Sequence, residues 1–395
     1  MKTTMDHHQK VPDMDIADIW RLLKERALES TDEGVVISDC SQPDMPIIYA
    51  NRAFTTMTGY GYDEVVGRNC RFLQGKETLA AAAQTIRQAI AAQQSCKVEI
   101  LNYRKDGTPF WNRLSITPVR DDEGRTTHFI GIQSDVTRRR DAEDSLRTIN
   151  KQLKRDLQAA AQVQHAQLPK NLPEIDGFKF GWRYQPCQEL AGDALNILPI
   201  DDNHIAVYVL DVSGHGVRAA LQSFSLNLDL RPRQDGPAFN LPEQVFARLN
   251  VKYPVEAETG MFFTILYGVL DTATGEFTYA SAGHPGPVLM KKGQPLQIIE
   301  TLSFPIGVSA DAEYTSKTVQ LEAGDRLILY TDGVVEALSS RDIPFGEERF
   351  LKTLSRNRTK PIDECLDAVM TSMKNWACHV DLRDDLSLIG IAAQG

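Results

Sequence analysis

Long apolar runs are missing from this 395-residue sequence. No stretch approaches the roughly 18 consecutive apolar residues of a membrane-spanning helix, so no span of a bilayer is expected. The first ten residues, MKTTMDHHQK, lack the apolar core of a secretory signal. The six cysteines are scattered and form no CxxC pair. We therefore expect a cytoplasmic protein with reduced thiols, in which any functional cysteine acts alone.

Positive charge is the second shortage. The chain carries 43 Lys and Arg against 53 Asp and Glu, a formal net charge of -10. A general nucleic-acid binder needs clustered Lys and Arg for the phosphates, so that function is not expected. The excess of acidic residues is compatible with bound cations. Hydrophobic residues make up 42% of the sequence, which is enough for two or three globular cores.

Glycine and proline are absent from the connecting segment, residues 137–168. Apolar residues recur there in steps of three or four among charges of both signs, which predicts a helix with one apolar stripe. The stripe consists of Leu146, Ile149, Leu153, Leu157, Ala160 and Val163. Because a helix of this length has no core of its own, the pattern favours a coiled coil with a second copy, and hence a homodimer. The alternative is a surface helix that packs on a neighbouring domain.

The N-terminal segment, residues 1–30, contains a second amphipathic helix. The apolar side of this helix comprises Ile16, Ile19, Trp20, Leu23 and Ala27. Such a helix either caps the following domain or forms a dimer contact, and the sequence pattern does not separate these two roles.

Residues 31–136 predict a small α+β domain. The short apolar runs GVVISD and PIIYAN indicate strands, a helix rich in Ala and Gln ends near Ala92, and three longer strands follow. The sequence RKDGT predicts a hairpin turn between the first two of these three strands. Strands, short helices and then an antiparallel run indicate a sheet with helices on one face.

The motif GRNCRFLQG, which contains Cys70, resembles the flavin-binding loop of the LOV class of PAS domains. The elements NRAF, TGY, FWN and GIQSDVT match the same class in order, and a match of this extent is specific. The resemblance implies blue-light photochemistry in which the Cys70 sulfur adds reversibly to a flavin ring. FMN rather than FAD is expected, because no long insertion follows FLQG to accommodate an adenine.

The same resemblance implies which polar side chains hold the flavin. Arg71 and Arg87 are expected to pair with its phosphate, since a guanidinium fork suits phosphate oxygens. Asn102 and Asn112 are expected to hydrogen-bond to the polar edge of the ring, because buried amides are costly unless paired. The complete predicted set is Asn69, Cys70, Arg71, Gln74, Arg87, Asn102, Asn112 and Gln133.

Gln133 links this predicted site to the connecting segment. Its amide offers both donors and an acceptor, so photochemistry that protonates the facing ring nitrogen is expected to rotate it. Gln133 lies on the last predicted strand, a few residues before the helix begins at about Thr137. A change of hydrogen bonds at that place can bias a helix that has two arrangements.

Residues 169–395 combine many antiparallel strands with a few long helices, which predicts two sheets covered by helices. Apolar strands end at Asp211 and Asp332, and a third begins at Asp384–Asp385. A carboxylate beside a buried strand is costly unless it is hydrogen-bonded or bound to a cation. Three such strand ends in one place would form an oxygen-rich site for Mg²⁺ or Mn²⁺.

Together with the segments SAGHPGP and QVQHAQLP, these aspartates resemble the PPM family of metal-dependent protein phosphatases, in the bacterial branch that controls sigma-factor partner switching. The resemblance implies two metal ions that activate a shared water. Asp211 would bridge the ions, the Val212 carbonyl would bind one, and Asp332 and Asp384 would complete the set. The implied substrate is a phosphorylated anti-sigma factor antagonist of the STAS type.

One element departs from the family pattern. The usual GGDxxD reads AGDALN here, so Asp193 is retained as a catalytic residue and Asn196 replaces the second Asp. This replacement predicts weaker binding of one ion if the position supports a metal through water. Asp385 is expected to be a neighbour and not a ligand. His215 and His284 are expected to stabilise turns, because oxygen-rich Mg²⁺ sites seldom use His.

The combined prediction is a blue-light-regulated protein serine/threonine phosphatase that light activates. One alternative is a light-gated binding protein with an inactive phosphatase domain, suggested by Asn196. Another is a flavin redox sensor that does not use light. The four predicted parts are a helical cap at 1–30, a LOV domain at 31–136, a coiled-coil linker at 137–168 and a PPM-type α/β sandwich of two antiparallel sheets flanked by helices at 169–395.

Overall fold

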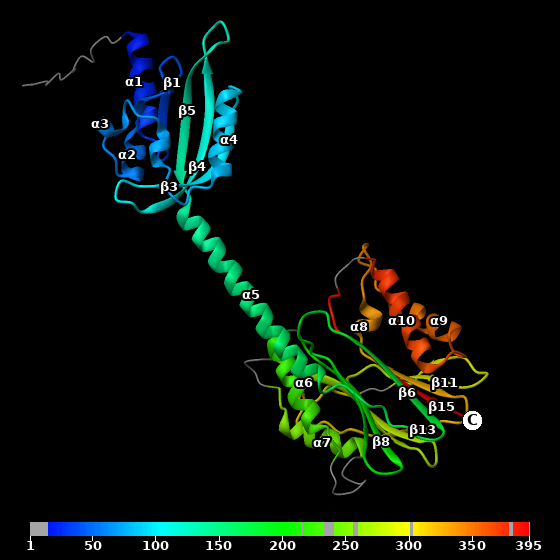
Figure 1. The fold of residues 1–395 in the computed structure, drawn as a ribbon. Helices are drawn as coiled ribbons and strands as arrows, with labels where there is room; N and C mark the ends of the chain where they lie inside the picture. Colours follow the sequence, from blue (N-terminus) through cyan, green and yellow to red (C-terminus); the bar gives the residue numbers. More distant parts are fainter. Residues whose placement is uncertain are drawn as a thin grey trace, which may run out of the picture. The chain divides into compact units, whose positions relative to one another are not determined.

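The computed structural model describes residues 15–214, 216–232, 241–255, 260–300, 303–378 and 382–394. The chain forms two compact units, Met1–Lys151 and Gln152–Gly395, and the boundary between them falls within the connecting helix α5 (Figure 1). Within the described ranges, none of the helices has the length and apolarity needed to cross a membrane.

The first unit is built on one antiparallel sheet in the order β2-β1-β5-β4-β3. Asn51 caps the helix after β2: its Oδ1 accepts hydrogen bonds from the backbone N–H of Phe54 at 3.0 Å and of Val35 at 2.8 Å. The cap therefore fastens the helical layer to the central strands. The elements are α1 Ile16–Glu29, β1 Gly34–Asp39, β2 Ile47–Ala50, α2 Arg52–Thr58, α3 Tyr62–Val65, the 3₁₀ helix η1 Cys70–Leu73, α4 Ala80–Ala91, β3 Cys96–Tyr103, β4 Pro109–Arg120 and β5 Thr126–Asp135.

Helix α5, Thr137–His165, confirms the predicted long helix, which ends shortly before Pro169. Its first turn is fixed to the sheet: the Asp135 side chain accepts from the Thr137 N–H at 2.9 Å, and the Arg140 guanidinium lies 3.7 Å from the centroid of the Trp111 ring. No residue of α5 is fully buried. Much of the predicted stripe is exposed, with Leu146 at 60%, Ile149 at 62%, Leu153 at 54% and Val163 at 56%. The coiled coil with a second copy stays a prediction.

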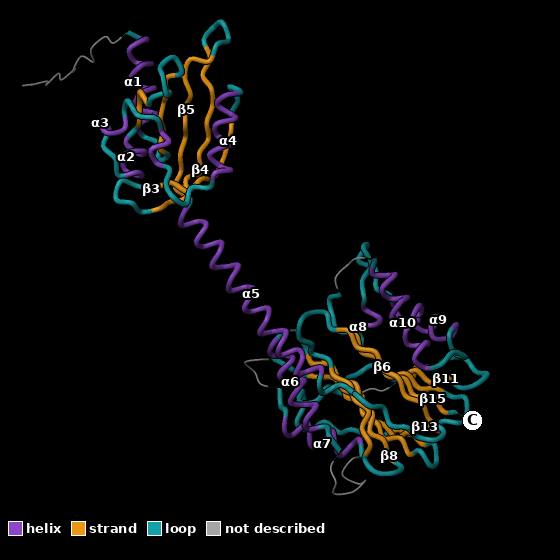
Figure 2. The backbone as a smooth tube through the Cα atoms, viewed as in Figure 1, coloured by secondary structure: helices purple, strands orange, loops and turns teal. Residues whose placement is uncertain are grey.

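The second unit contains two antiparallel five-stranded sheets, in the orders β13-β10-β9-β8-β7 and β12-β11-β14-β15-β6 (Figure 2). The sheets pack on each other through one apolar core, helices α6 and α7 cover the first sheet, and α9 and α10 cover the second. The elements are β6 Phe178–Gln185, β7 Ala194–Pro199, β8 His204–Val212, α6 Val217–Asp229, α7 Pro242–Lys252, β9 Phe263–Asp271, β10 Glu276–Ala282, β11 Val288–Met290, β12 Gln297–Ile298, β13 Lys317–Gln320, β14 Arg326–Tyr330, α8 Gly333–Glu336, α9 Gly346–Arg356, α10 Ile362–Ala377 and β15 Leu386–Ala393.

Strand β8 shows how the sequence produces these layers. Successive side chains of a strand point to opposite faces. Val207 and Val209 face the core between the sheets, whereas Tyr208 and Leu210 face the helices. Both faces are covered, so the run before Asp211 is apolar throughout instead of alternating with polar residues. The strand then delivers Asp211 to the end of the sheet.

The α+β architecture with a helical linker and a sandwich of two antiparallel sheets confirms the predicted fold class. Sequence reasoning missed several elements, among them strand β7 and helix α9. Strand β7 begins at Ala194, within the AGDALN motif. Its side chains at Leu195 and Ile197 are buried in the core between the sheets.

Candidate functional sites

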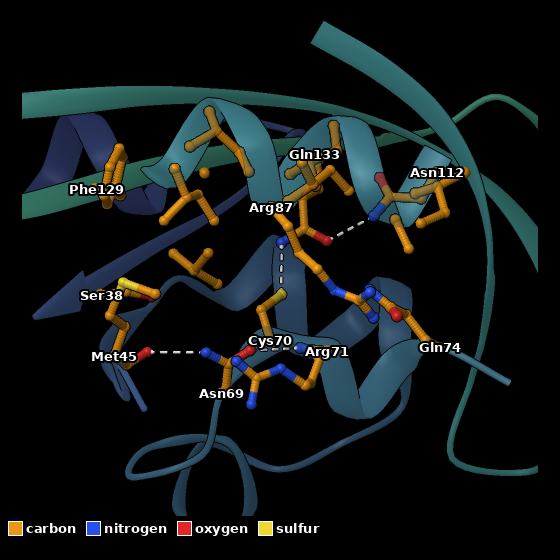
Figure 3. A pocket seen from close by; sticks show the side chains of 18 of the residues that line it. Ser38, Met45, Asn69, Cys70, Arg71, Gln74, Arg87, Asn112, Phe129 and Gln133 are labelled. Carbon is orange, nitrogen blue, oxygen red and sulfur yellow. Dashed lines mark hydrogen bonds between the residues drawn. The ribbon is translucent and has the colours of Figure 1, made fainter. Parts of the chain in front are cut away.

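The first unit contains a cavity of about 340 Å³. It lies between the sheet and the segments around η1 and α4, and Figure 3 shows its lining side chains. Apolar side chains from the sheet, including Ile100, Leu114 and Phe129, form much of the wall. A cavity of this size with a mainly apolar wall and a few polar groups is typical of a small-molecule site.

Cys70 is the first residue of η1, and its side chain lines this cavity. The Gln133 side chain, from the central strand β5, places its Nε2 at 3.5 Å from the Cys70 Sγ (Figure 3). Burial raises the pKa of the Cys70 thiol to about 11, although the hydrogen bond from Gln133 opposes this change. The sulfur is therefore a protonated thiol at neutral pH.

Three amides form a chain across the cavity wall. The Asn112 Nδ2 donates to the Asn102 Oδ1 at 2.9 Å and to the Gln133 Oε1 at 2.8 Å. The Asn112 Oδ1 is buried and has no partner. A buried acceptor without a partner costs about 1–3 kcal/mol. A flavin ring, which carries an N–H donor on its polar edge, fits this arrangement.

The remaining predicted flavin residues also line the cavity. Arg71 forms an ion pair with Asp44, and both side chains are largely exposed. The Asn69 Oδ1 accepts from the Arg71 N–H at 3.0 Å, which fixes the loop that carries Cys70. Arg87 reaches the cavity from α4, and Gln74 follows η1. The pairing of the two arginines with a flavin phosphate stays a prediction.

In the second unit, three predicted aspartates lie near one another at the ends of strands. Asp211 is at the end of β8, Asp332 follows β14 and Asp384 precedes β15. Burial, together with repulsion from Asp332 and Asp384, raises the pKa of Asp211 to about 7. Burial and the nearby Asp384 also raise the pKa of Asp332. The structure therefore groups carboxylates from both sheets.

Asp193 and Asp385 support this acidic cluster from opposite sheets. The Asp193 Oδ2 accepts from the hydroxyls of Thr331 at 2.8 Å and Ser387 at 2.6 Å. Burial and repulsion from Asp211 raise the pKa of Asp193. Asp385 accepts from the backbone N–H of Gly192 at 2.7 Å. The side chain of Asp385 therefore fastens the Asp193 loop, and its predicted role as a neighbour of the metal ligands stays a prediction.

The donor chemistry of the cluster fits hard divalent cations, because its carboxylates repel one another and a cation would remove that repulsion. A Cβ added to Gly192 would lie 2.9 Å from the Val212 carbonyl oxygen, so glycine keeps the space beside that predicted ligand free. In the described ranges, no three His, Cys, Asp or Glu side chains already form a complete metal-binding group. The assignment of Asp211, Val212, Asp332 and Asp384 as ligands stays a prediction.

The end of α5 contacts the loop that carries Asp193. The Gln164 Nε2 donates to the Ala191 carbonyl at 2.7 Å, and the Gln164 Oε1 accepts from the Ala191 N–H at 3.2 Å. The His165 ring packs edge-on against Tyr184, with 5.7 Å between ring centroids. The linker is therefore bonded to the residue two positions before Asp193.

The expectation that Asn196 weakens the binding of one ion, if its position supports a metal through water, stays a prediction. The Asn196 Nδ2 donates to the Gln167 carbonyl at 2.8 Å and to the Asn227 Oδ1 at 3.4 Å. Both partners are acceptors, so a carboxylate at this position would lose these bonds. Asn196 therefore joins β7 to the segment that follows α5.

His215 and His284 are the two histidines that are predicted to stabilise turns. His215 lies outside the described residues. The backbone of His284 is held in its turn by Ser281, whose Oγ donates to the His284 carbonyl at 2.8 Å. The His284 ring, however, does more than stabilise a turn, because it hydrogen-bonds to Thr264 and to the Tyr330 carbonyl on separate strands.

Comparison with known proteins finds a matching family for a region of each unit. Residues 32–138 match the PAS domain family, and residues 201–394 match the family of stage II sporulation protein E (SpoIIE). The first region is 54% identical over 112 residues to phototropin-2 from rice, and 50% identical over 117 residues to a blue-light-activated histidine kinase from Rhizobium johnstonii. The chain joins a LOV-type PAS domain to a SpoIIE-type domain.

The chain spans only part of the length of these two curated relatives. The matches cover 28% of this chain and 12% of phototropin-2, and 30% of this chain and 34% of the Rhizobium kinase. For the SpoIIE-type domain, the solved SiaA-PP2C domain of Pseudomonas aeruginosa is similar with a TM-score of 0.54 and 19% identity. That match covers 62% of this chain and 98% of the SiaA domain, and it supports the fold alone.

Several residues around the acidic cluster were not found from the sequence. Thr331 and Ser387 hold Asp193, and Gln164 holds the preceding loop. Thr331 and Ser387 lie next to the predicted aspartate motifs, which was a usable signal. Gln164 lies in the segment QVQHAQLP, but that segment does not indicate its partner, a backbone 27 residues away that becomes its neighbour only in the folded domain.

Proposed function

We propose that this chain is a blue-light-regulated protein serine/threonine phosphatase. The observation that carries the proposal is the connection of α5 at both of its ends. Asp135, two residues after Gln133 on β5, caps the start of the helix, and Gln164 near its end holds the backbone of Ala191 beside the acidic cluster. A change at the flavin cavity therefore has a covalent and hydrogen-bonded route to the carboxylates.

The LOV domain would bind FMN in the cavity and would sense blue light. The flavin would supply light absorption and an electrophilic ring carbon. Cys70 holds a protonated thiol in the cavity, and Gln133 already donates to that sulfur while it accepts from Asn112. Protonation of the ring nitrogen that faces Gln133 would turn an acceptor into a donor, and the Gln133 amide would rotate to accept from it.

Helix α5 would transmit this change to the SpoIIE-type domain, and light would raise activity. Its exposed stripe of Leu146, Ile149 and Leu153 fits a second copy of the chain, which would form a dimer along the helix. We also propose the four-part division into a cap at 1–30, a LOV domain at 31–136, a linker at 137–168 and a phosphatase domain at 169–395.

The SpoIIE-type domain would remove phosphate from a phosphoprotein. Two Mn²⁺ or Mg²⁺ ions would supply an activated water and neutralise the phosphoryl oxygens. Asp211, Asp332 and Asp384 would hold them with the Val212 carbonyl, and Asp193 would support Asp211. The two hydrogen bonds of the Asn196 amide, to the Gln167 carbonyl and the Asn227 Oδ1, are compatible with an active domain. The proposed substrate is a phosphorylated anti-sigma factor antagonist of the STAS type.

The test is phosphate release from a phosphoserine-bearing STAS protein, with Mn²⁺, in the dark and under blue light. The proposal expects metal-dependent release that rises on illumination and a light response that Cys70→Ala abolishes. Equal rates in the dark and under light would remove the regulatory proposal. A protein that binds the partner in a light-dependent way, but releases no phosphate with Mn²⁺ or Mg²⁺, would support the binding-protein alternative instead.

A further inference from the structure

His284 lies at the end of the sandwich where the carboxylates gather. It follows β10 in the first sheet, and 3% of its surface is exposed. Its ring Nδ1 is 2.7 Å from the hydroxyl of Thr264, on β9 of the same sheet. Its Nε2 is 3.1 Å from the carbonyl oxygen of Tyr330, on β14 of the other sheet. The imidazole therefore bridges the two sheets.

Each of the two residues that bond the His284 ring is a neighbour of a predicted metal ligand, one through strand pairing and the other along the chain. Thr264 stands directly opposite Asp211 in the β8–β9 pairing. Tyr330 is the last residue of β14, two positions before Asp332. The ring thus connects the backbone beside one carboxylate to the backbone that leads into another. Because the two carboxylates come from different sheets, their separation depends on how the sheets are held together at this end.

The two hydrogen-bond partners also define the tautomer of the His284 ring. A carbonyl only accepts, so the Nε2 must carry the hydrogen and donate to Tyr330. Burial lowers the pKa of His284 to about 3, so the ring is neutral and the Nδ1 accepts from the Thr264 hydroxyl. The other cross-sheet contacts described above use the carboxylates of Asp193 and Asp385. The imidazole joins the sheets through a hydroxyl and a backbone carbonyl instead.

We propose that His284 is a positioning residue that sets the separation of Asp211 and Asp332, and thereby the affinity of the acidic cluster for divalent cations. The inference rests on the proposed function in taking these carboxylates as metal ligands. Residues that orient ligands without touching the metal typically change metal affinity by about 10–100-fold when they are replaced. His284 itself touches neither the metal nor the substrate in this account.

The test is Mn²⁺ binding by the full-length protein in the dark, measured from the free-ion signal in electron paramagnetic resonance. His284→Asn leaves an amide that can reach Thr264 but not Tyr330, and we expect affinity to fall by about 10–100-fold. His284→Gln can place an amide nitrogen near the position of Nε2, and we expect partial recovery. Thr264→Val removes the donor to Nδ1, and we expect a smaller loss in the same direction.

Tyr208→Phe provides the matched control. The Tyr208 hydroxyl donates to the Asn227 Oδ1 at 2.7 Å, so the variant also removes one buried hydrogen bond, on the same strand as Asp211. We expect Tyr208→Phe to lower the urea midpoint of the metal-free protein without changing Mn²⁺ affinity. If His284→Asn does not fold, Thr264→Val still tests the bridge.

The outcomes separate this inference from the proposed function. Wild-type affinity in folded His284→Asn, or in Thr264→Val where His284→Asn does not fold, would overturn the positioning role even if the enzyme hydrolyses its substrate. An equal loss of affinity in Tyr208→Phe would also overturn it, because the effect would then be a general loss of stability. If the wild type binds Mn²⁺ but releases no phosphate, the proposed function fails, and weaker binding by His284→Asn would still support the bridge.

Discussion

Replacing Gln164 with Ala should uncouple the light response from phosphate release. Gln164 makes a pair of hydrogen bonds to the backbone of Ala191, at 2.7 and 3.2 Å, and these bonds connect the end of α5 to the loop of Asp193. Ala at position 164 keeps the helix, because Ala has the highest helix propensity. The change therefore removes the contact and leaves the linker intact.

The size of the effect follows from the two bonds that are lost. Each contributes about 0.5–1.5 kcal/mol net, and an unpaired buried backbone group costs about 1–3 kcal/mol. Ala191 is 1% exposed, so water does not readily replace the amide. A loss of about 2 kcal/mol corresponds to a factor of about 30 in the equilibrium between two linker arrangements. The ratio of light to dark activity should fall toward one by up to this factor.

The assay is the rate of phosphate release with Mn²⁺ in the dark and under blue light, for wild type, Gln164→Ala and the control Gln162→Ala. Gln162 is exposed two residues earlier on the same helix, so its replacement matches the change in composition without breaking the Ala191 contact. Bleaching of the flavin band should be normal in all three proteins. A wild-type light-to-dark ratio in Gln164→Ala would refute this route of transmission.

Further predictions concern the two sites and the linker. Asp211→Asn should lower phosphate release by at least about 100-fold, because metal ions supply several kcal/mol of transition-state stabilisation. Binding of the partner protein should persist in this variant. Near-normal turnover would contradict the assignment of Asp211 as a metal ligand. In the flavin-free protein, burial raises the pKa of Cys70 from 9.0 to about 11, so the folded state binds this proton more tightly. The stability that this proton contributes is complete below about pH 9 and is lost as pH rises through 11. Urea unfolding at pH 8 and at pH 11 measures the free energy of unfolding that is lost between them. That loss should be smaller in Cys70→Ala than in wild type by on the order of 2 kcal/mol. Ile149→Lys should shift the sedimentation coefficient from dimer to monomer, whereas Lys151→Ala should not; a monomeric wild type would exclude the coiled coil.

The residues of a candidate site can be predicted from the sequence where one short segment contains several of them. GRNCRFLQG contains the thiol and its flanking amide, and η1 begins at Cys70 within that segment. The stripe of α5 was likewise readable, because helical periodicity needs no knowledge of the partner. The aspartates at strand ends could be found for a similar reason, since the apolar runs before Asp211 and Asp332 mark buried strands.

Contacts between distant segments could not be predicted in this way. The place of Asn196 in its motif gives no indication of its hydrogen bonds to Gln167 and Asn227. The His284 turn was visible in the sequence, whereas its bridge to Tyr330 spans 46 residues and two sheets. A motif shows which side chains lie in a segment, whereas the packing of the two sheets determines which groups each side chain contacts.

The sequence by itself therefore determined the two domain types, the helical linker, the thiol that lines the cavity and most of the carboxylates that gather in the second unit, because each is encoded over a few adjacent residues. Only the tertiary structure decided that the end of α5 holds Ala191, that Asp385 fastens the Asp193 loop and that an imidazole joins the sheets beside the acidic cluster. These contacts form between groups that approach one another only when the apolar faces of both sheets are buried together, and that burial depends on the whole chain.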